Sequence, residues 1–196
     1  MKKLVTADAV LLPDTAERVF VGEIFDVYHW QQQLYDGSEA TFEMLKRPDT
    51  VSTICVVNDK IIVLNDEQPN SGVRVSFPGG RVDLTDESVE AAAQREVLEE
   101  TGYSFKNWRL VKLWQPHTKI EWFVYLFVAW EVTGQQAPHH DPGEKIAQRE
   151  LDFAQLKELL ITKAQSMNPT NELITTLESV DDLLDLPAAT GQDVDR

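Results

Sequence analysis

The sequence predicts an α+β fold with α/β/α layering, preceded by an N-terminal β-strand extension. Strand-like segments come first, then one helical segment, then further strands and finally helices. A chain of 196 residues, 42% hydrophobic and 26% charged, is long and apolar enough for one folded domain with an appendage. We divide it into an extension with a possible dimerisation role (1–48), a main domain (49–186) and a flexible acidic tail (187–196).

The first 80 residues predict strands joined by tight turns. Residues 19–33 and 40–45 are rich in β-branched and aromatic side chains and flank a turn at 35–38. A second hairpin is predicted by residues 51–57 and 61–64, which flank Asn58-Asp59-Lys60. A short strand at 73–77 leads into Pro78-Gly79-Gly80.

Residues 88–100 have helical periodicity. Their apolar side chains recur at the spacing of one helix face: Val89, Ala92, Ala93 and Val97. Ser88 is a suitable N-cap, and Gly102 is a suitable C-terminal stop.

The rest of the chain predicts two more strands and two helices. The strands are residues 108–114 and 122–132, and the second is apolar enough to be central. Asp152 and Gln155 resemble a capping box, which opens a helix to about residue 164. Apolar residues between 173 and 184 mark a last helix.

The charge limits the partners of the chain. A net charge of −15 argues against binding a nucleic-acid backbone or an anionic membrane surface. Cys55, the single cysteine, lies in an apolar strand and reads as a buried thiol in a reducing compartment. With no secretory pattern and no apolar stretch of membrane-spanning length, we expect a cytoplasmic protein.

Residues 81–100 hold seven acids and two bases. Glu96, Glu99 and Glu100 occupy one face of the predicted helix, opposite its apolar stripe. They repel one another and sit where the helix dipole disfavours anions. A hard divalent cation reverses this effect, because carboxylate oxygens are its preferred ligands. A solvated acidic face is the alternative reading of the three glutamates alone.

The segment from Gly80 to Tyr103 resembles the Nudix hydrolase motif. That motif is Gly, five residues, Glu, seven residues, Arg-Glu, an aliphatic residue, any residue, Glu-Glu, any residue, Gly and an apolar residue. Six residues separate Gly80 from Glu87, one more than in the family; Asp86 has the right spacing from Gly80 but not from Arg95, so we choose Glu87. The matching residues are Gly80, Glu87, Arg95, Glu96, Val97, Glu99, Glu100, Gly102 and Tyr103.

The resemblance implies an α/β/α sandwich and metal-assisted hydrolysis of a nucleoside diphosphate linked to another moiety. Glu96 and Glu100 would be the main ligands of Mg²⁺ or Mn²⁺, with the Gly79 carbonyl turned toward the same ion. Glu99 would be a further ligand or help to activate water. Arg95 would orient the carboxylates, together with Glu87.

The best substrate prediction is ADP-ribose or another nucleotide sugar, giving a nucleoside monophosphate and a sugar phosphate. In family members of this kind, similar N-terminal strands build a homodimer, and Pro116 resembles a proline that marks them. The loop with Glu144 resembles one whose Glu acts as base or metal ligand, although a surface role is equally open. Arg74 and Gly80 are the expected substrate-binding residues.

Alternatives remain at the sequence level. The same site would suit a nucleoside triphosphate, a dinucleoside polyphosphate or a capped RNA end. A non-catalytic nucleotide-sensing domain of the same fold is the alternative of another class, although such domains usually lose the carboxylates that this chain keeps. Lys112 and Lys119 could also meet phosphate, although Arg74 is the preferred candidate. Packing or a surface position is the preferred interpretation of Phe20, Trp30, Tyr35, His117, His139 and His140.

Overall fold

The computed structural model describes residues 2–69, 71–140, 143, 145–163 and 169–195. The chain divides into two compact units. Unit 1 comprises residues 1–50, 113–124 and 190–196, and unit 2 comprises residues 51–112 and 125–189. Unit 1 therefore contains the expected extension, and also a central segment and the C-terminal residues. None of the helices in the described ranges has the length and apolarity needed to cross a membrane.

Unit 1 is built from strands. Four of them form a sheet in the order β2-β3-β4-β9, in which β4 and β9 run parallel and the other pairs antiparallel. Gly37, in the left-handed region at φ 86°, makes the predicted turn between β3 and β4. The strands mainly in this unit are β1 (Lys2–Val5), β2 (Glu17–Phe20), β3 (Asp26–Gln33), β4 (Glu39–Lys46), β9 (Ile120–Glu121) and β12 (Gln192–Asp195).

The C-terminal tail differs from the expectation. We expected a flexible tail after residue 187, but Gln192–Asp195 forms β12, which pairs antiparallel with β1. Lys2 lies opposite Asp195 and Val5 opposite Gln192. The acidic tail gains order because β1 provides backbone hydrogen-bonding partners, which its own composition does not reveal.

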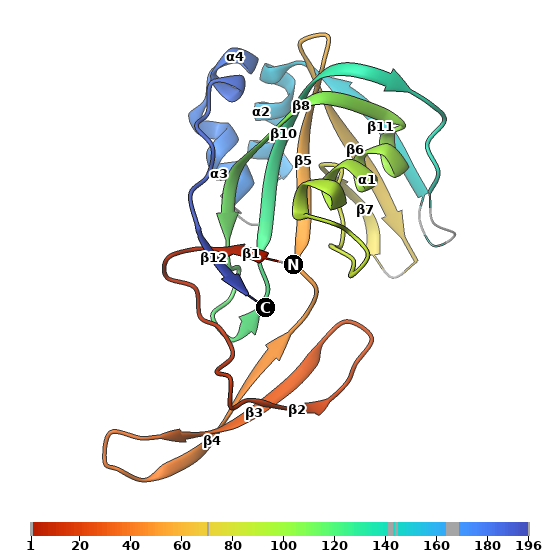
Figure 1. The fold of residues 1–196 in the computed structure, drawn as a ribbon. Coiled ribbons are helices and arrows are strands. Elements are labelled where there is room, and N and C mark those ends of the chain that lie inside the picture. The colour runs from red at the N-terminus through yellow and green to blue at the C-terminus, as the bar shows by residue number, and fades with distance from the viewer. Residues whose placement is uncertain (1, 70, 141–142, 144, 164–168, 196) are drawn as a thin grey trace. The chain divides into compact units, whose positions relative to one another are not determined.

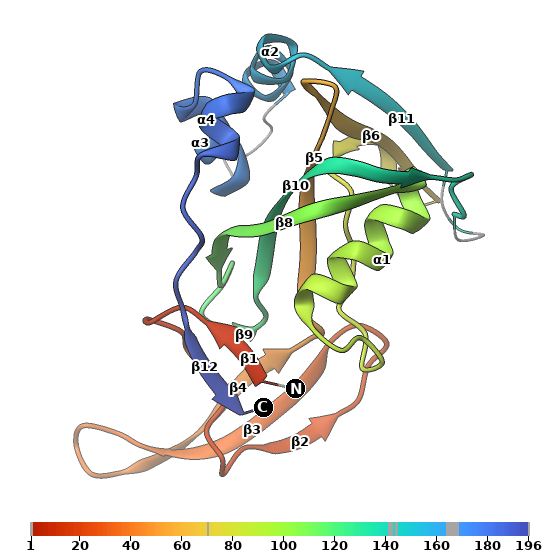
Figure 2. The ribbon, with the colours of Figure 1, turned by 45° about the horizontal axis from the view of Figure 1, so that its top comes forward.

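Unit 2 contains a larger sheet with helices on both faces (Figures 1 and 2). The strand order is β11-β6-β5-β10-β8, with β7 also paired to β6, so β5 is the central strand and β10, which we predicted to be central, is an interior strand between β5 and β8. The strands centred here are β5 (Thr50–Val57), β6 (Lys60–Gln68), β7 (Ser71–Ser76), β8 (Tyr103–Trp114), β10 (Val124–Gln135) and β11 (Lys145–Leu151). The helices are α1 (Val89–Thr101), α2 (Phe153–Lys163), α3 (Pro169–Thr176) and α4 (Val180–Leu184).

The helices cover the two faces of this sheet as an α/β/α sandwich. Val97 of α1 packs in one cluster with Cys55, Val57, Ile62 and Leu64, which alternate on one face of β5 and β6. Figure 2 shows α1 on one side of the sheet and α2, α3 and α4 on the other. Fully buried residues of these last three helices are Leu156, Ile174 and Leu183.

Local signals account for many of the boundaries. Asn58 and Asp59, both at positive φ, make the predicted turn between β5 and β6. The Asp152 and Gln155 side chains each accept a hydrogen bond from the other's backbone N–H, so the predicted capping box is confirmed. The predicted helix at 173–184 is instead two helices, because the capping box of Ser179 and Asp182 starts α4 afresh.

Candidate active site

Helix α1 places the acidic side chains. The Ser88 Oγ accepts a hydrogen bond from the Ala91 N–H at 3.0 Å, and Gly102 ends the helix with φ 75°, as predicted. Ala92, Ala93 and Val97 are fully buried against the sheet. The opposite face therefore carries Glu96, Glu99 and Glu100 at i, i+3 and i+4.

Arg95 links the first two of these glutamates. Its Nη1 donates to Glu96 Oε1 at 2.9 Å and to Glu99 Oε2 at 3.2 Å. The Glu99 side chain is the more open of the two, 46% exposed against 15% for Glu96. Glu96 is thus held close to the protein, whereas Glu99 is accessible to water and to a substrate.

Asp86, and not Glu87, is the acid that holds Arg95. The Asp86 carboxylate accepts from Arg95 Nε at 3.1 Å and from Nη2 at 3.0 Å. In the described part of the chain, the exposed Glu87 side chain forms no hydrogen bond or ion pair. Our pairing of Arg95 with Glu87 is therefore corrected, because the extra residue lies between Asp86 and the helix and Asp86 keeps its five-residue spacing from Gly80.

The hydrogen bonds between these groups shift their proton affinities. The bond from Arg95 holds the pKa of Asp86 below its ordinary value, despite an opposing effect of burial. The bond to Asp86 is likewise the largest cause of a raised pKa for Arg95, followed by burial, which opposes it, and the bond to Glu96. Arg95 also donates from Nη2 to the Arg81 carbonyl at 2.8 Å, so the guanidinium is fixed from several sides.

The Gly79-Gly80 turn lies against the same carboxylates. The Gly79 N–H donates to Glu100 Oε2 at 2.7 Å. A Cβ built on Gly80 would lie 2.6 Å from the carboxyl carbon of Glu96, so a side chain at this position would displace that glutamate. Gly79 has φ 155°, and a Cβ there would collide with the main chain of Val51. Both glycines are needed for this close approach.

The turn leaves one carbonyl available. The Pro78 carbonyl accepts from the Thr53 N–H at 2.7 Å, and the Gly80 carbonyl accepts from the Val51 N–H at 2.9 Å. Among the described residues, the Gly79 carbonyl between them accepts no hydrogen bond. It is thus the main-chain oxygen of the turn that is available to a ligand; that it binds a metal stays a prediction.

The chemical types of these residues suit a hard divalent cation. Carboxylates from one helix face and a carbonyl from a facing turn are the oxygen donors that Mg²⁺ prefers. Within the described ranges, however, no three His, Cys, Asp or Glu side chains already converge on one point. Glu96 and Glu99 accept hydrogen bonds from Arg95, and Glu100 accepts one from the Gly79 N–H. These carboxylates must therefore turn away from their present partners to bind one shared ion.

The other predicted residues are distributed differently. Arg74 is exposed on β7, the strand that leads into the glycine turn, and its side chain has no hydrogen-bond or ion-pair partner in the part of the chain that is described. Glu144 lies outside the described residues. Cys55 is fully buried, and burial, with the nearby charge of Glu100, raises the pKa of its thiol. It is therefore a packing residue and not a nucleophile.

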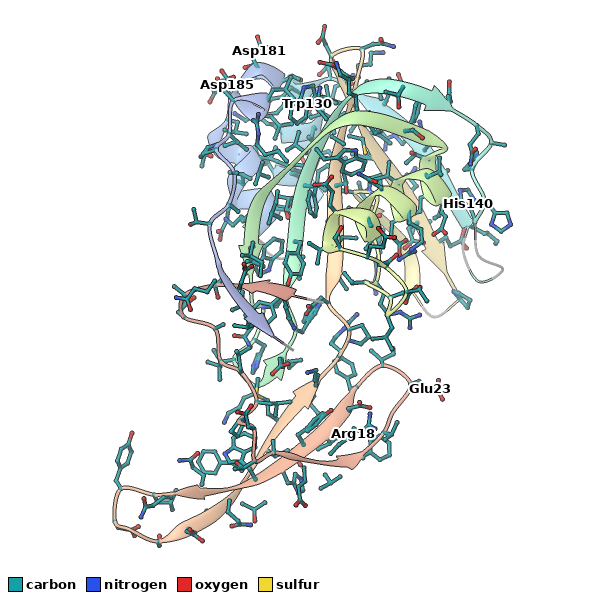
Figure 3. All side chains as sticks on the ribbon, in the orientation of Figure 1. Arg18, Glu23, Trp130, His140, Asp181 and Asp185 are labelled. Atoms are coloured by element: carbon teal, nitrogen blue, oxygen red, sulfur yellow. The ribbon has the colours of Figure 1, made fainter. Side chains whose placement is uncertain are left out.

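The aromatic candidates belong to unit 1, whereas the carboxylates belong to unit 2. Trp30 packs with Phe42 in unit 1 at a ring distance of 5.9 Å, while Phe20 and Tyr35 are exposed. His140 is different, because its Nε2 lies 3.2 Å from the Glu100 carbonyl (Figure 3). We had interpreted His140 as a packing or surface group, and no local signal pointed to this contact. We had weighed Asp86 and set it aside for Glu87, although its five-residue spacing from Gly80 was a signal for it.

Comparison with known families agrees with this geometry. A family model described as the NUDIX domain matches residues 46–174. The chain is a Nudix hydrolase. The matched segment contains the whole motif and most of unit 2, so the family assignment and the α/β/α fold concern the same part of the chain.

Two relatives of this Nudix hydrolase are informative. "ADP-ribose pyrophosphatase" of Bacillus subtilis (strain 168) is 27% identical over 162 residues, which cover 80% of this chain and 82% of the relative. A solved structure titled "Crystal structure of ADP compounds hydrolase" has a TM-score of 0.67 at 22% identity and covers 86% of this chain and 91% of that chain. The second likeness concerns the fold.

Proposed function

We propose that this Nudix hydrolase cleaves the diphosphate of a nucleotide sugar, with ADP-ribose as the best candidate, in a reaction that depends on Mg²⁺ or Mn²⁺. The observation that carries the proposal is the carboxylate face of α1 lying against the Gly79-Gly80 turn. The Bacillus relative, similar over four-fifths of both chains, supports the choice of substrate.

The chemistry is a hydrolysis. The oxygen of water forms a bond to one phosphorus, the bridging P–O bond breaks, and the products are a nucleoside monophosphate and a sugar phosphate. A bound divalent cation neutralises charge on the diphosphate, orients it and activates water. In our proposal Glu96, Glu100 and the Gly79 carbonyl hold the ion, while the exposed Glu99 holds it or accepts a proton from water.

Other residues orient these groups and bind the substrate. Arg95, fixed by Asp86, sets the positions of Glu96 and Glu99. Arg74 offers its exposed positive charge to the substrate's phosphates, and Gly80 leaves room for Glu96. Glu144 remains a proposed base or metal ligand on the strength of the family resemblance.

Product chromatography tests the substrate. Purified protein is incubated with ADP-ribose, other nucleotide sugars, nucleoside triphosphates, dinucleoside polyphosphates and capped RNA, each with Mg²⁺. We expect AMP and ribose phosphate from ADP-ribose, no reaction in excess EDTA and recovery when Mg²⁺ is restored. If the protein hydrolyses one of the other substrate classes but no nucleotide sugar, the substrate proposal is refuted. Hydrolysis in excess EDTA would refute the metal proposal.

We also propose a homodimer formed through unit 1. Strand β2 lies at one end of its sheet, and the segment Val19, Phe20, Val21 and Ile24 exposes 51–65% of each side chain. An apolar segment at an open strand edge is a template for pairing with another chain. Light scattering should show a dimer that Val21→Lys converts to a monomer; a monomeric wild-type chain would contradict this.

The cellular location is a further proposal. We propose that the protein is cytoplasmic. Its single cysteine is buried and free and takes no part in the proposed chemistry, as suits a reducing compartment.

A further inference from the structure

The C-terminal end of α1 is an unfavourable place for three carboxylates. The last carbonyls of a helix lack partners within it and carry the negative end of its dipole. Glu96, Glu99 and Glu100 add anions there, and the last turn of α1 contains no basic residue. Without donors from elsewhere in the chain, this turn would tend to fray.

The segment that follows β10 supplies those donors. The Gln136 N–H donates to the Gly102 carbonyl at 2.9 Å, and the His139 N–H donates to the Glu99 carbonyl at 2.8 Å. The Glu100 carbonyl, which lies between these two in the sequence, is 3.2 Å from the His140 Nε2. Because a carbonyl oxygen only accepts, the ring nitrogen is the donor. His140 is thus the one side chain in this series of caps.

We propose that His140 is a positioning residue of the active site, which acts by holding the main chain of Glu100. Glu100 is then fixed at two points, its carbonyl by His140 and its carboxylate by the Gly79 N–H. This inference rests on the proposed function, in which Glu100 is a metal ligand. It assigns a role to a histidine 40 positions away from Glu100 in the sequence.

The physical consequence of losing the ring is local. The Glu100 carbonyl would lose this donor, and the carboxylates of the last turn would lose part of their fixed geometry. The backbone bond from His139 to Glu99 would remain, so the helix itself should persist. Outer groups that orient metal ligands typically account for about 10–100-fold in metal affinity or activity.

Three variants separate the donor from the bulk of the ring. His140→Phe keeps an aromatic ring but removes the donor, whereas His140→Gln retains an N–H on a flexible side chain. His139→Ala is the matched control, because His139 is exposed and contributes through its backbone N–H alone. If His140→Phe does not fold, His140→Ala makes the same comparison with a smaller side chain.

Each variant is measured by Mn²⁺ titration, by kcat and KM with the best nucleotide substrate, and by thermal melting. We expect His140→Phe to weaken Mn²⁺ binding and lower kcat by about 10-fold or more, with His140→Gln recovering most of both and His139→Ala resembling wild type. Equal Mn²⁺ affinity in wild type and His140→Phe would overturn the inference, as would equal losses in His140→Phe and His139→Ala. If the wild type hydrolyses no anhydride, the proposed function fails, and the Mn²⁺ titration still decides the role of His140.

Discussion

Units 1 and 2 both pair acidic side chains with basic ones, but the number of acids for each basic side chain differs. In unit 1 the largely buried Asp49 and the fully buried Glu121 each have a lysine partner: Asp49 is 2.9 Å from Lys3, and Glu121 is 2.7 Å from Lys46. Backbone N–H groups complete the arrangement, with Phe123 donating to Asp49 and Leu12 to Glu121. Charge is therefore balanced pair by pair.

In unit 2 one arginine serves several acids. Arg95 hydrogen-bonds Asp86, Glu96 and Glu99, and Glu100 adds a further charge in the same turn of helix. The Glu96 and Glu99 side chains remain partly open to solvent, whereas Glu121 is fully buried. The negative charge here exceeds what the protein neutralises.

The difference separates two uses of carboxylates. A buried, individually paired acid contributes to the stability of one arrangement, because removing either partner leaves a charge without compensation. A cluster with surplus negative charge carries a repulsive energy that a bound cation can relieve. The comparison predicts that substitutions in unit 2 change activity, whereas equivalent substitutions in unit 1 change stability.

The largest effect is expected for Glu100→Gln. The change keeps the shape and the acceptor for Gly79 N–H but removes a charge proposed to hold the metal. Loss of several kcal/mol of transition-state stabilisation corresponds to about a 10³-fold decrease in kcat. Steady-state kinetics measure it, with thermal melting as the control for folding. Unaffected turnover would show that the metal site is wrongly assigned.

Asp86→Asn should have the next largest effect on activity. Arg95 would lose its two-point contact with a carboxylate, and an outer group of this kind typically contributes about 10–100-fold. Glu87→Gln is the matched control and should change kcat less than about 2-fold, since surface substitutions that break no contact have small effects. The reverse order of effects would favour the original assignment of Glu87.

Glu121→Gln tests the unit 1 side of the comparison. Breaking a buried ion pair costs about 3–5 kcal/mol; we expect about 2 kcal/mol, because Lys46 is partly exposed and glutamine can still accept from Leu12 N–H. Urea unfolding measures this change in the free energy of unfolding. The kcat of the folded protein should stay near the wild-type value, and a large loss of kcat at unchanged stability would contradict the division of roles.

The smallest effect is a pH dependence of opposite sign in the two units. The bond from Arg95 lowers the pKa of Asp86 from 3.8, so the stability it contributes is full above pH 3.8 and is lost as pH falls through the lower folded value. Burial raises the pKa of Asp49 despite the opposing charge of Lys3. The stability that Asp49 contributes is therefore full below pH 3.8 and is lost as pH rises through the pKa of Asp49 in the folded protein.

Unfolding free energies between pH 3 and 7 test this prediction. The advantage of wild type over Asp86→Asn should shrink toward acid, whereas wild type should gain relative to Asp49→Asn over the same range. Parallel pH dependences for the two variants would show that the carboxyl groups do not differ in this way.

Helix boundaries and turns that are decided by neighbouring residues could be predicted from the sequence. The caps Ser88 and Gly102 bound α1 within one residue of the prediction, and the turn at Asn58-Asp59 joins β5 and β6. The capping box of Asp152 and Gln155 likewise forms. Each of these signals is complete within a few residues, so no distant contact was needed to interpret it.

Strands that pair with distant parts of the chain could not be predicted from the sequence. Strand β11 was not predicted, because five of its seven residues are exposed and its partner β6 lies about 80 positions earlier. Strand β12 was missed for a similar reason, since its pairing partner β1 lies at the other end of the chain. An edge strand needs few apolar residues when a neighbouring strand supplies its hydrogen bonds.

The sequence by itself determined helix α1 and its three-carboxylate face, because helical periodicity alone places Glu96, Glu99 and Glu100 together. The tertiary structure decided which residues hold that face. It brought Asp86 to Arg95 by way of a loop with one extra residue, and it brought His140 to the Glu100 carbonyl from 40 positions away. Spacing along a helix is a property of its own residues, whereas a contact across a loop depends on where the folded chain returns.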